Sequence, residues 1–285
     1  MKGRVIDRMI GLKIGEGGCS EVYEWDNNQT IIKIGKNNTS FDAMKKEFHN
    51  NQIVWGNGLP SPRPYEFLDI DGRPAIVFER IYGVSLMERY FKVFMQPSSE
   101  EANKEKKIDE IVRMTAQVLS DIHSRSNLSL PPQREMMKYS IQAPLYLTLA
   151  EKDQIIEHLD RLPMKQQLCH GDPNPGNMMI QGDEVVLIDW MNASIGNPEA
   201  DLAEYVIMIR HAILPPRVPN DAVLFFDSIR ERILQVFWEE YNRSSEITCK
   251  EVEEWVLPIA ARKLCADGIS EAEKELLLTE IRSRL

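Results

Sequence analysis

The chain has 285 residues and a net charge of −10 at pH 7. Its 43% hydrophobic and 27% charged residues are typical of a globular protein, and no apolar run approaches the roughly 18 residues that a membrane span needs. The acidic balance argues against a nucleic-acid partner, because proteins that bind nucleic-acid phosphates usually present a basic face. We therefore expect a protein that binds neither nucleic acid nor membrane.

The cysteines and the first residues indicate the cellular compartment in which the protein is expected. The four cysteines are widely spread and form no CxxC pair, which is a poor pattern for a disulfide framework or a zinc site. The segment Met1–Arg8 lacks the apolar core of a secretory signal. Both features favour a reducing, cytoplasmic location.

The first eighty residues are predicted to form mainly β-strands. Alternating apolar and polar residues, bounded by Gly, Asn, Asp and Pro, predict strands at 12–14, 21–25, 30–34, 65–70 and 75–78. A helical pattern covers Phe41–Trp55, and Gly56-Asn57-Gly58 ends it. The dipeptide Asp71-Gly72 predicts a tight hairpin between the last two strands, since both turn positions need positive φ.

The rest of the chain is predicted to be mostly helical, with one interruption. Apolar residues recur at helical spacing over 105–123, 152–162, 200–213, 222–241 and 250–265. The interruption is a strand at 167–169 and a small hairpin of 178–180 with 185–188. Two late helices are expected to begin with capping boxes, Thr248 with Glu251 and Ser270 with Glu273.

These elements predict an α+β protein with two lobes. Residues 1–80 would form a β-rich N-lobe with one main helix, and residues 81–285 a mostly α-helical C-lobe. Residues 1–80 hold 11 basic and 11 acidic residues, so the second part carries the whole net charge. This charge is either a solvated surface that keeps the protein soluble or an attraction for a cationic substrate.

The strongest chemical signal is a loop of oxygen donors. His170-Gly171-Asp172 is followed by Asn177, and Asp189 comes directly after the strand at 185–188. Phosphoryl transfer needs one carboxylate to orient and deprotonate the attacking hydroxyl, and oxygen ligands for magnesium. Asp172 suits the first role, with Asn177 and Asp189 as the metal ligands. Taken alone, His170-Gly171-Asp172 would indicate a turn, and only its spacing to Asn177 and Asp189 favours the chemical role.

The segment 168–205 resembles the aminoglycoside phosphotransferase-like branch of the protein-kinase-like fold, which includes choline kinase-type proteins. The shared features are H-G-D-x4-N, the following I-D-W and a later G-x4-D-L-A that contains Asp201. The resemblance implies that Asp172 is the catalytic base and that Asn177 and Asp189 bind Mg²⁺. It also implies that Asp201 anchors the backbone of the catalytic loop. The other interpretation of Asp201 is a helix N-terminal acid that interacts with the helix dipole.

The N-terminal residues follow the same resemblance in order and spacing. Gly15 and Gly17 resemble the loop that covers the ATP phosphates, although Ser20 replaces the third glycine of the protein-kinase pattern. Lys33 matches the lysine that contacts the α- and β-phosphates; otherwise it is an exposed strand lysine. Glu47 is its best partner, unless that helix face is simply solvated, since Lys45 and Lys46 adjoin it.

The nucleotide and the acceptor follow from the same comparison. The backbone of Glu79 and Ile81 is expected to meet the adenine edge of ATP, and the sequence leaves GTP open. Trp190-Met191 follows Asp189 where protein kinases have Phe-Gly, and no A-P-E-like segment comes later. We expect a kinase of a small hydroxylated molecule, with an aminoglycoside, another cationic compound or a sugar as acceptor. The alternatives are an inactive nucleotide-binding relative and, less favoured, a protein kinase. The sequence does not fix the oligomeric state.

Overall fold

A computed structural model describes residues 10–26, 28–96, 101–143, 145–182, 184–214, 218–266 and 269–285. Its contacts divide the chain into two units. The first consists of the residues up to Gly83 together with Val186–Met191, and the second of Val84–Val185 together with Asn192–Leu285. The segment Met1–Arg8, used above to argue against a secretory signal, lies outside the described residues.

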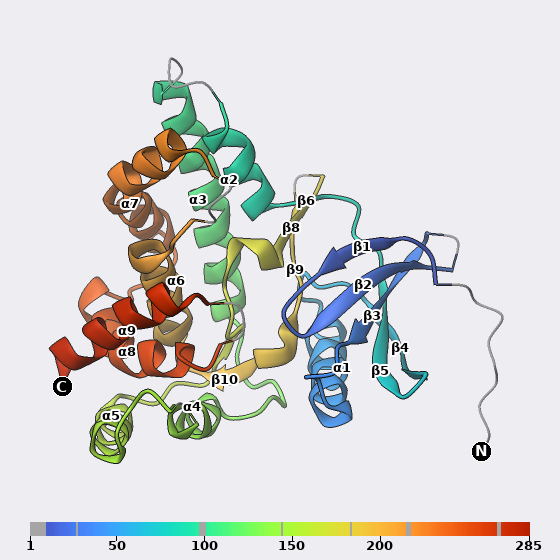
Figure 1. The fold of residues 1–285 in the computed structure, drawn as a ribbon, viewed down its shortest axis with the longest axis horizontal. Coiled ribbons are helices and arrows are strands. Elements are labelled where there is room, and N and C mark those ends of the chain that lie inside the picture. The colour runs from blue at the N-terminus through green and yellow to red at the C-terminus, as the bar shows by residue number, and fades with distance from the viewer. Residues whose placement is uncertain are drawn as a thin grey trace. The chain divides into compact units, whose positions relative to one another are not determined.

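The first unit contains a five-stranded antiparallel sheet in the order β1-β2-β3-β5-β4 (Figure 1). The strands are β1 (Lys13–Glu16), β2 (Ser20–Trp25), β3 (Thr30–Gly35), β4 (Pro64–Ile70) and β5 (Arg73–Glu79). All five predicted strands are present. The Asp71-Gly72 hairpin is also confirmed, because φ is 51° at Asp71 and 82° at Gly72, as a two-residue turn with both φ positive requires.

The two faces of this sheet are buried in different clusters, because neighbouring residues of a strand point to opposite faces. One face carries Trp25, Ile32, Ile34, Ala75 and Val77. The other carries Ile76 and Phe78, which pack with Met44 of α1 (Phe41–Gly56). Since Lys33 lies between Ile32 and Ile34, the alternation of β3 directs its side chain toward α1.

Helix α1 begins with Ser40, whose side chain accepts a hydrogen bond from the Ala43 N–H. Its buried residues are Met44, Glu47, Asn50, Asn51 and Val54. Three of these five side chains are polar, so apolar periodicity alone could not identify the buried face. Among its apolar residues, Val54 is fully buried and Phe48 only partly.

The second unit is mostly helical. Its helices are α2 (Leu86–Phe94), α3 (Glu101–His123), α4 (Gln133–Gln142), α5 (Leu149–Arg161), α6 (Pro198–His211), α7 (Asn220–Tyr241), α8 (Cys249–Lys263) and α9 (Glu271–Arg284). The short strands are β6 (Val84–Ser85), β7 (Gln167–Cys169), β8 (Met178–Gln181), β9 (Glu184–Leu187) and β10 (Ser194–Gly196). The strand β9 begins in this unit and its end belongs to the first.

The helix α6 lies at the centre of this unit. It packs on α7, α8, α9 and β7 (Figure 1), and eleven of its residues are buried. A helix buried on nearly all sides belongs to a core and is not a surface amphipathic helix. Both predicted capping boxes, at Thr248 and at Ser270, are confirmed, and Thr148 with Glu151 forms a third that the sequence analysis did not identify.

The strand pairing in the second unit was predicted only in part. The neighbours β8 and β9 form the expected hairpin, and β6 adds a third strand to it. The strand β7 does not join this sheet, because it pairs antiparallel with β10, which was not predicted. The pair β7–β10 therefore brackets the segment between them, which holds the predicted catalytic loop.

Two further features concern the whole of the described chain. None of the helices in the described ranges is long and apolar enough to cross a membrane. None of the four cysteines, all of which lie in the described ranges, forms a disulfide, and Cys169 is fully buried.

Candidate active site

In the first unit, Lys33 joins two carboxylates. Its Nζ lies 2.6 Å from Oε1 of Glu47 and 3.1 Å from Oδ1 of Asp189. The side chains of Lys33 and Glu47 are 10% and 1% exposed, whereas that of Asp189 is 41% exposed. The predicted pairing of Lys33 with Glu47 is confirmed, and the cluster presents its charge to solvent through Asp189.

The two carboxylates keep Lys33 charged. Burial alone would lower the pKa of Lys33, but the carboxylates of Glu47 and Asp189 outweigh it and raise that pKa above its ordinary value. Lys33 is therefore a cation throughout the physiological range. Oε2 of Glu47 is buried and has no hydrogen-bond partner in the described part of the chain, so Glu47 depends on Lys33 for its main stabilising contact.

The backbone around Asp189 is held from α1. Asp189 has a φ of 65°, a left-handed conformation that is uncommon for a residue with a side chain. Beside it, Nδ2 of Asn50 donates to the carbonyl oxygens of Trp190, at 3.0 Å, and Met191, at 3.3 Å. Asn50 is 1% exposed, and Trp190 is fully buried. This contact could not be predicted from the sequence, because a polar residue inside a helix usually indicates a solvated face.

The predicted phosphate-covering loop links β1 to β2. The N–H of Gly17 donates to the carbonyl of Ser20 at 2.9 Å. A Cβ placed on Gly17 would meet no described atom within 4 Å, so this side of the loop is open. Ser20 itself is buried at the start of β2. Nζ of Lys36 donates to the carbonyl of Gly17 at 2.8 Å, which ties the loop to the end of β3.

The residues proposed to meet the adenine lie at the end of β5. The N–H of Glu79 donates to the carbonyl of Arg63 at 2.9 Å, so that N–H is already engaged. The N–H of Ile81 has no hydrogen-bond partner among the described residues. Ile81 is therefore the stronger candidate for an N–H donor to a nucleotide base.

In the second unit, two asparagines hold the carboxylate of Asp172. Nδ2 of Asn174 donates to Oδ1 of Asp172 at 2.9 Å, and Nδ2 of Asn177 donates to Oδ2 at 3.0 Å. Oδ1 of Asn174 accepts from the N–H of Gly176 at 2.8 Å, which caps the short 3-10 turn Pro175–Asn177. Asn174 was not among the predicted site residues, although it orients the same carboxylate as Asn177.

This geometry also fixes the amide of Asn177. Because its NH₂ group faces a carboxylate and the Asp172 carbonyl, its side-chain oxygen points away from both. A side-chain amide oxygen is a ligand that hard cations accept. Among the described residues, no cluster of three or more His, Cys, Asp or Glu side chains could hold a metal.

Asp201 of α6 anchors the backbone of the loop. Its carboxylate accepts the N–H of His170 at 2.6 Å and the N–H of Gly171 at 3.0 Å. Gly171 has a φ of 79°, and a Cβ there would lie 2.5 Å from the Asn192 carbonyl oxygen, so only glycine fits. The predicted anchoring role of Asp201 is confirmed. His170 Nδ1 accepts the N–H of Asp172 at 3.3 Å, in keeping with a role in orienting the loop.

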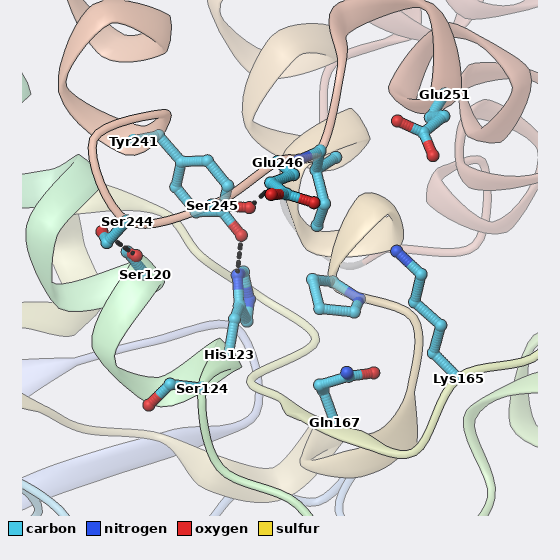
Figure 2. Close-up of a pocket in the computed structure, with 12 residues that line it drawn as sticks. Ser120, His123, Ser124, Lys165, Gln167, Tyr241, Ser244, Ser245, Glu246 and Glu251 are labelled. Atoms are coloured by element: carbon cyan, nitrogen blue, oxygen red, sulfur yellow. Dashed lines mark hydrogen bonds between the residues drawn. The ribbon is translucent and has the colours of Figure 1, made fainter.

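His123 contacts Asp201, and Tyr241 in turn contacts His123. Nε2 of His123, at the end of α3, lies 3.3 Å from Oδ2 of Asp201. Its Nδ1 lies 2.9 Å from the Tyr241 hydroxyl, a contact that Figure 2 shows. Burial would raise the pKa of Asp201, but the hydrogen bond and charge of His123, with the N–H and charge of His170, outweigh it and hold that pKa below its ordinary value. Asp201 is therefore an anion inside the unit.

His123 and Tyr241 also line a polar cavity of about 420 Å³. Figure 2 shows the residues around it. Hydroxyl groups of Ser120, Ser124, Tyr241, Ser244 and Ser245 line it, together with Lys165, Gln167 and Glu246. Its walls do not include Asp172. The cavity therefore does not contain the predicted base.

Solved kinase structures share this fold. The chain aligns with aminoglycoside phosphotransferase APH(4)-Ia at a TM-score of 0.64 and 14% identity, over 98% of this chain and 95% of that chain. It aligns with the choline kinase LicA from Streptococcus pneumoniae at a TM-score of 0.62 and 15% identity, over 98% of this chain and 95% of that chain. It aligns with the type VIII aminoglycoside-3'-phosphotransferase at a TM-score of 0.59 and 15% identity, over 90% of this chain and 93% of that chain. The fold is α+β and protein-kinase-like, as predicted.

The family follows from the sequence. A model described as the phosphotransferase enzyme family matches residues 16–226, which is more than half of the chain. The protein belongs to that family, and the predicted resemblance is confirmed. The match includes every predicted site residue except Gly15. Comparison with curated protein sequences finds no significant match.

The Asp201 anchor generates a prediction about stability. Asp201→Asn turns an NH₂ group toward backbone donors, and losing one hydrogen bond to a charged group costs about 1.5–3 kcal/mol. Because the folded-state pKa is lowered, the stabilisation is complete above the unfolded carboxyl pKa of about 3.9 and is lost as pH falls through the folded pKa.

Urea unfolding at pH 7 and at pH 4 and below measures both effects. The difference between wild type and Asp201→Asn should be largest at pH 7 and shrink at acid pH. Asp121→Asn, an exposed site on α3, is the matched control and should leave stability within about 0.5 kcal/mol. Equal stability of Asp201→Asn and wild type at pH 7 would contradict the anchor.

Proposed function

We propose that this protein transfers the γ-phosphoryl group of ATP, with Mg²⁺, to a hydroxyl group of a small molecule. The observation that carries the proposal is the carboxylate of Asp172, oriented by Asn174 and Asn177 on a loop that buried Asp201 anchors. The buried Lys33–Glu47 pair and Asp189 supply the charges that a nucleotide and its metal need. Membership of the phosphotransferase enzyme family supports the same chemistry.

The first unit would hold the nucleotide. Lys33, kept cationic and directed by Glu47, pairs with the α- and β-phosphates. The backbone of Gly15 and Gly17, in the loop that ends at Ser20, would cover the phosphates. The free N–H of Ile81 and the carbonyl of Glu79 meet the adenine edge. Structures similar to this one hold ADP or AMP-PNP, which supports ATP over GTP as the nucleotide.

The metal would be held by one carboxylate and one amide. Asp189 offers an anionic ligand that is accessible to solvent, and the amide oxygen of Asn177 is turned away from Asp172. These hard oxygen donors fit Mg²⁺, which commonly takes one or two carboxylates and completes its shell with phosphates and water. When bound, the ion offsets phosphate charge. Lys33 contributes a further positive charge beside Asp189.

Asp172 would act on the acceptor. A carboxylate that accepts two amide donors has a fixed direction, and it can still accept the hydroxyl proton in hydrogen-bond geometry. As the hydroxyl oxygen forms its bond to the γ-phosphorus, its proton passes to Asp172 and the bond to the β-phosphate oxygen breaks. The products are a phosphorylated acceptor and ADP. Positioning and charge supply most of the catalysis in this reaction class.

The acceptor class is proposed from the similar structures and from the distribution of charge. One similar structure, a variant of APH(4)-Ia, is a complex with hygromycin B, and another is a choline kinase. The residues after 80 carry the whole net charge of −10. We propose a hydroxylated cationic acceptor. Its KM should rise with ionic strength, since exposed charges are screened within about 10 Å at 0.1 M salt and about 3 Å at 1 M. A KM that is flat in salt would indicate a neutral sugar.

The role of Asp172 predicts the effect of Asp172→Asn. The variant keeps the size of the side chain and loses the base, so kcat should fall by about 10²–10⁴-fold. The affinity for Mg-ATP should stay within about twofold, because the proposed base does not hold the nucleotide. Steady-state ADP release and calorimetry measure the two quantities. Asp160→Asn on α5 is the matched control, and wild-type turnover in Asp172→Asn would exclude Asp172 as the base.

The role of Asp189 predicts a different pattern. Asp189→Ala removes the anionic metal ligand but leaves Lys33 paired with Glu47. Binding of ATP should become weak and should no longer respond to magnesium, which calorimetry with and without EDTA would show. Asp42→Ala, in the exposed first turn of α1, changes the same charge and should bind as wild type does. Unchanged, magnesium-dependent affinity in Asp189→Ala would mean that another group holds the ion.

A further inference from the structure

Gly171, which directly precedes Asp172, is held on both of its sides. Its N–H donates to Oδ1 of Asp201 at 3.0 Å, and its carbonyl accepts from the guanidinium of Arg262 at 2.9 Å. Asp201 lies on α6, whereas Arg262 lies on α8, more than 90 residues further along the chain than Gly171. The sequence analysis interpreted this late part of the chain only as helices.

Arg262 is itself fixed by a buried acid. Its guanidinium forms an ion pair with Glu204, which lies one helical turn after Asp201 on α6. The side chain of Glu204 is 9% exposed and also contacts Nζ of Lys263 at 3.3 Å. Two buried carboxylates on one face of α6 thus control one glycine, Asp201 directly and Glu204 through Arg262.

The two bonds act on the most flexible point of the loop. Glycine rotates more freely than any other residue, and Gly171 adopts a left-handed φ of 79°. Its N–H belongs to the peptide before it and its carbonyl to the peptide that leads to Asp172. Holding both groups fixes the rotation on both sides of the Gly171 Cα, and therefore the direction in which Asp172 leaves the loop.

We propose that Arg262 is a positioning residue for Asp172 and that Glu204 holds it in place. The proposal rests on the function proposed above, in which Asp172 is the base. Through Arg262, α8 is then part of the catalytic apparatus as well as part of the core. The plainer alternative is that Arg262 only fastens α8 to α6, in which case its effect on turnover would follow its effect on stability.

Lys263 provides a matched control. It has the same charge, lies on the same helix and contacts the same Glu204, but only Arg262 reaches Gly171. Arg262→Gln should lower kcat by about 10–10²-fold, since small misplacements of reacting groups cost up to about 10²-fold. Its KM for Mg-ATP should stay within about twofold of wild type, and Lys263→Gln should keep wild-type kcat. Equal kcat in Arg262→Gln and wild type would overturn the proposal.

A double variant separates positioning from folding. Arg262→Gln leaves Glu204 without its main partner, which can destabilise the fold. Glu204→Gln with Arg262→Gln removes both charges, so thermal stability should recover toward wild type while kcat stays low. If kcat recovers together with Tm, Arg262 is only a structural contact and the proposal is wrong.

Hydrogen exchange gives a readout that does not need turnover. Amide exchange over residues 168–177 should be faster in Arg262→Gln than in wild type and unchanged in Lys263→Gln, because the carbonyl restraint on Gly171 is lost. Unchanged exchange in Arg262→Gln would overturn the proposal. Asp172→Asn, assayed in parallel, tests the proposed function separately: if it retains turnover, the base is misassigned, whatever the exchange of the loop shows.

Discussion

The loop that carries Asp172 depends on the hydrogen bonds of the buried carboxylate of Asp201. An isolated charge inside a protein is costly, and this one is offset by two backbone N–H groups and by His123. These contacts stabilise both the buried charge and the loop. The same bonds that keep Asp201 ionised hold His170 and Gly171 in one conformation, so the direction of Asp172 follows from the position of α6.

The first unit also contains a buried charge that neighbouring groups of opposite charge stabilise. Lys33 is surrounded by apolar strand residues and is kept as a cation by Glu47 and Asp189. Only Asp189 is substantially exposed, so the cluster offers one accessible carboxylate next to a fixed ammonium group. Asn50 holds the backbone after Asp189 at the same helix that carries Glu47. One helix thus positions both the partner of Lys33 and the segment of Asp189.

The sequence predicted the parts of this structure that are encoded locally. Turn chemistry identified the Asp71-Gly72 hairpin, hydroxyl-carboxylate spacing identified two capping boxes, and the H-G-D-x4-N pattern located Asp172. Contacts over long separations were missed, because Asn50 and Arg262 look like ordinary helix residues until folding brings them to a backbone carbonyl. Asn174 lies inside the recognised loop, yet its role depends on the rotation of a side chain. The strand β10 is three residues long and is defined only by its partner β7.

We propose that the charge cluster of Lys33 and the oriented carboxylate of Asp172 act in the same phosphoryl-transfer reaction. The most direct measurement incubates the protein with ATP, Mg²⁺ and a panel of aminoglycosides, choline-like alcohols and neutral sugars, and follows ADP and the acceptor mass together. We expect one phosphorylated acceptor to form for each ADP released. Tight Mg-ATP binding with neither ADP nor any phosphorylated acceptor across the panel would contradict it and would indicate a nucleotide-binding protein without catalysis.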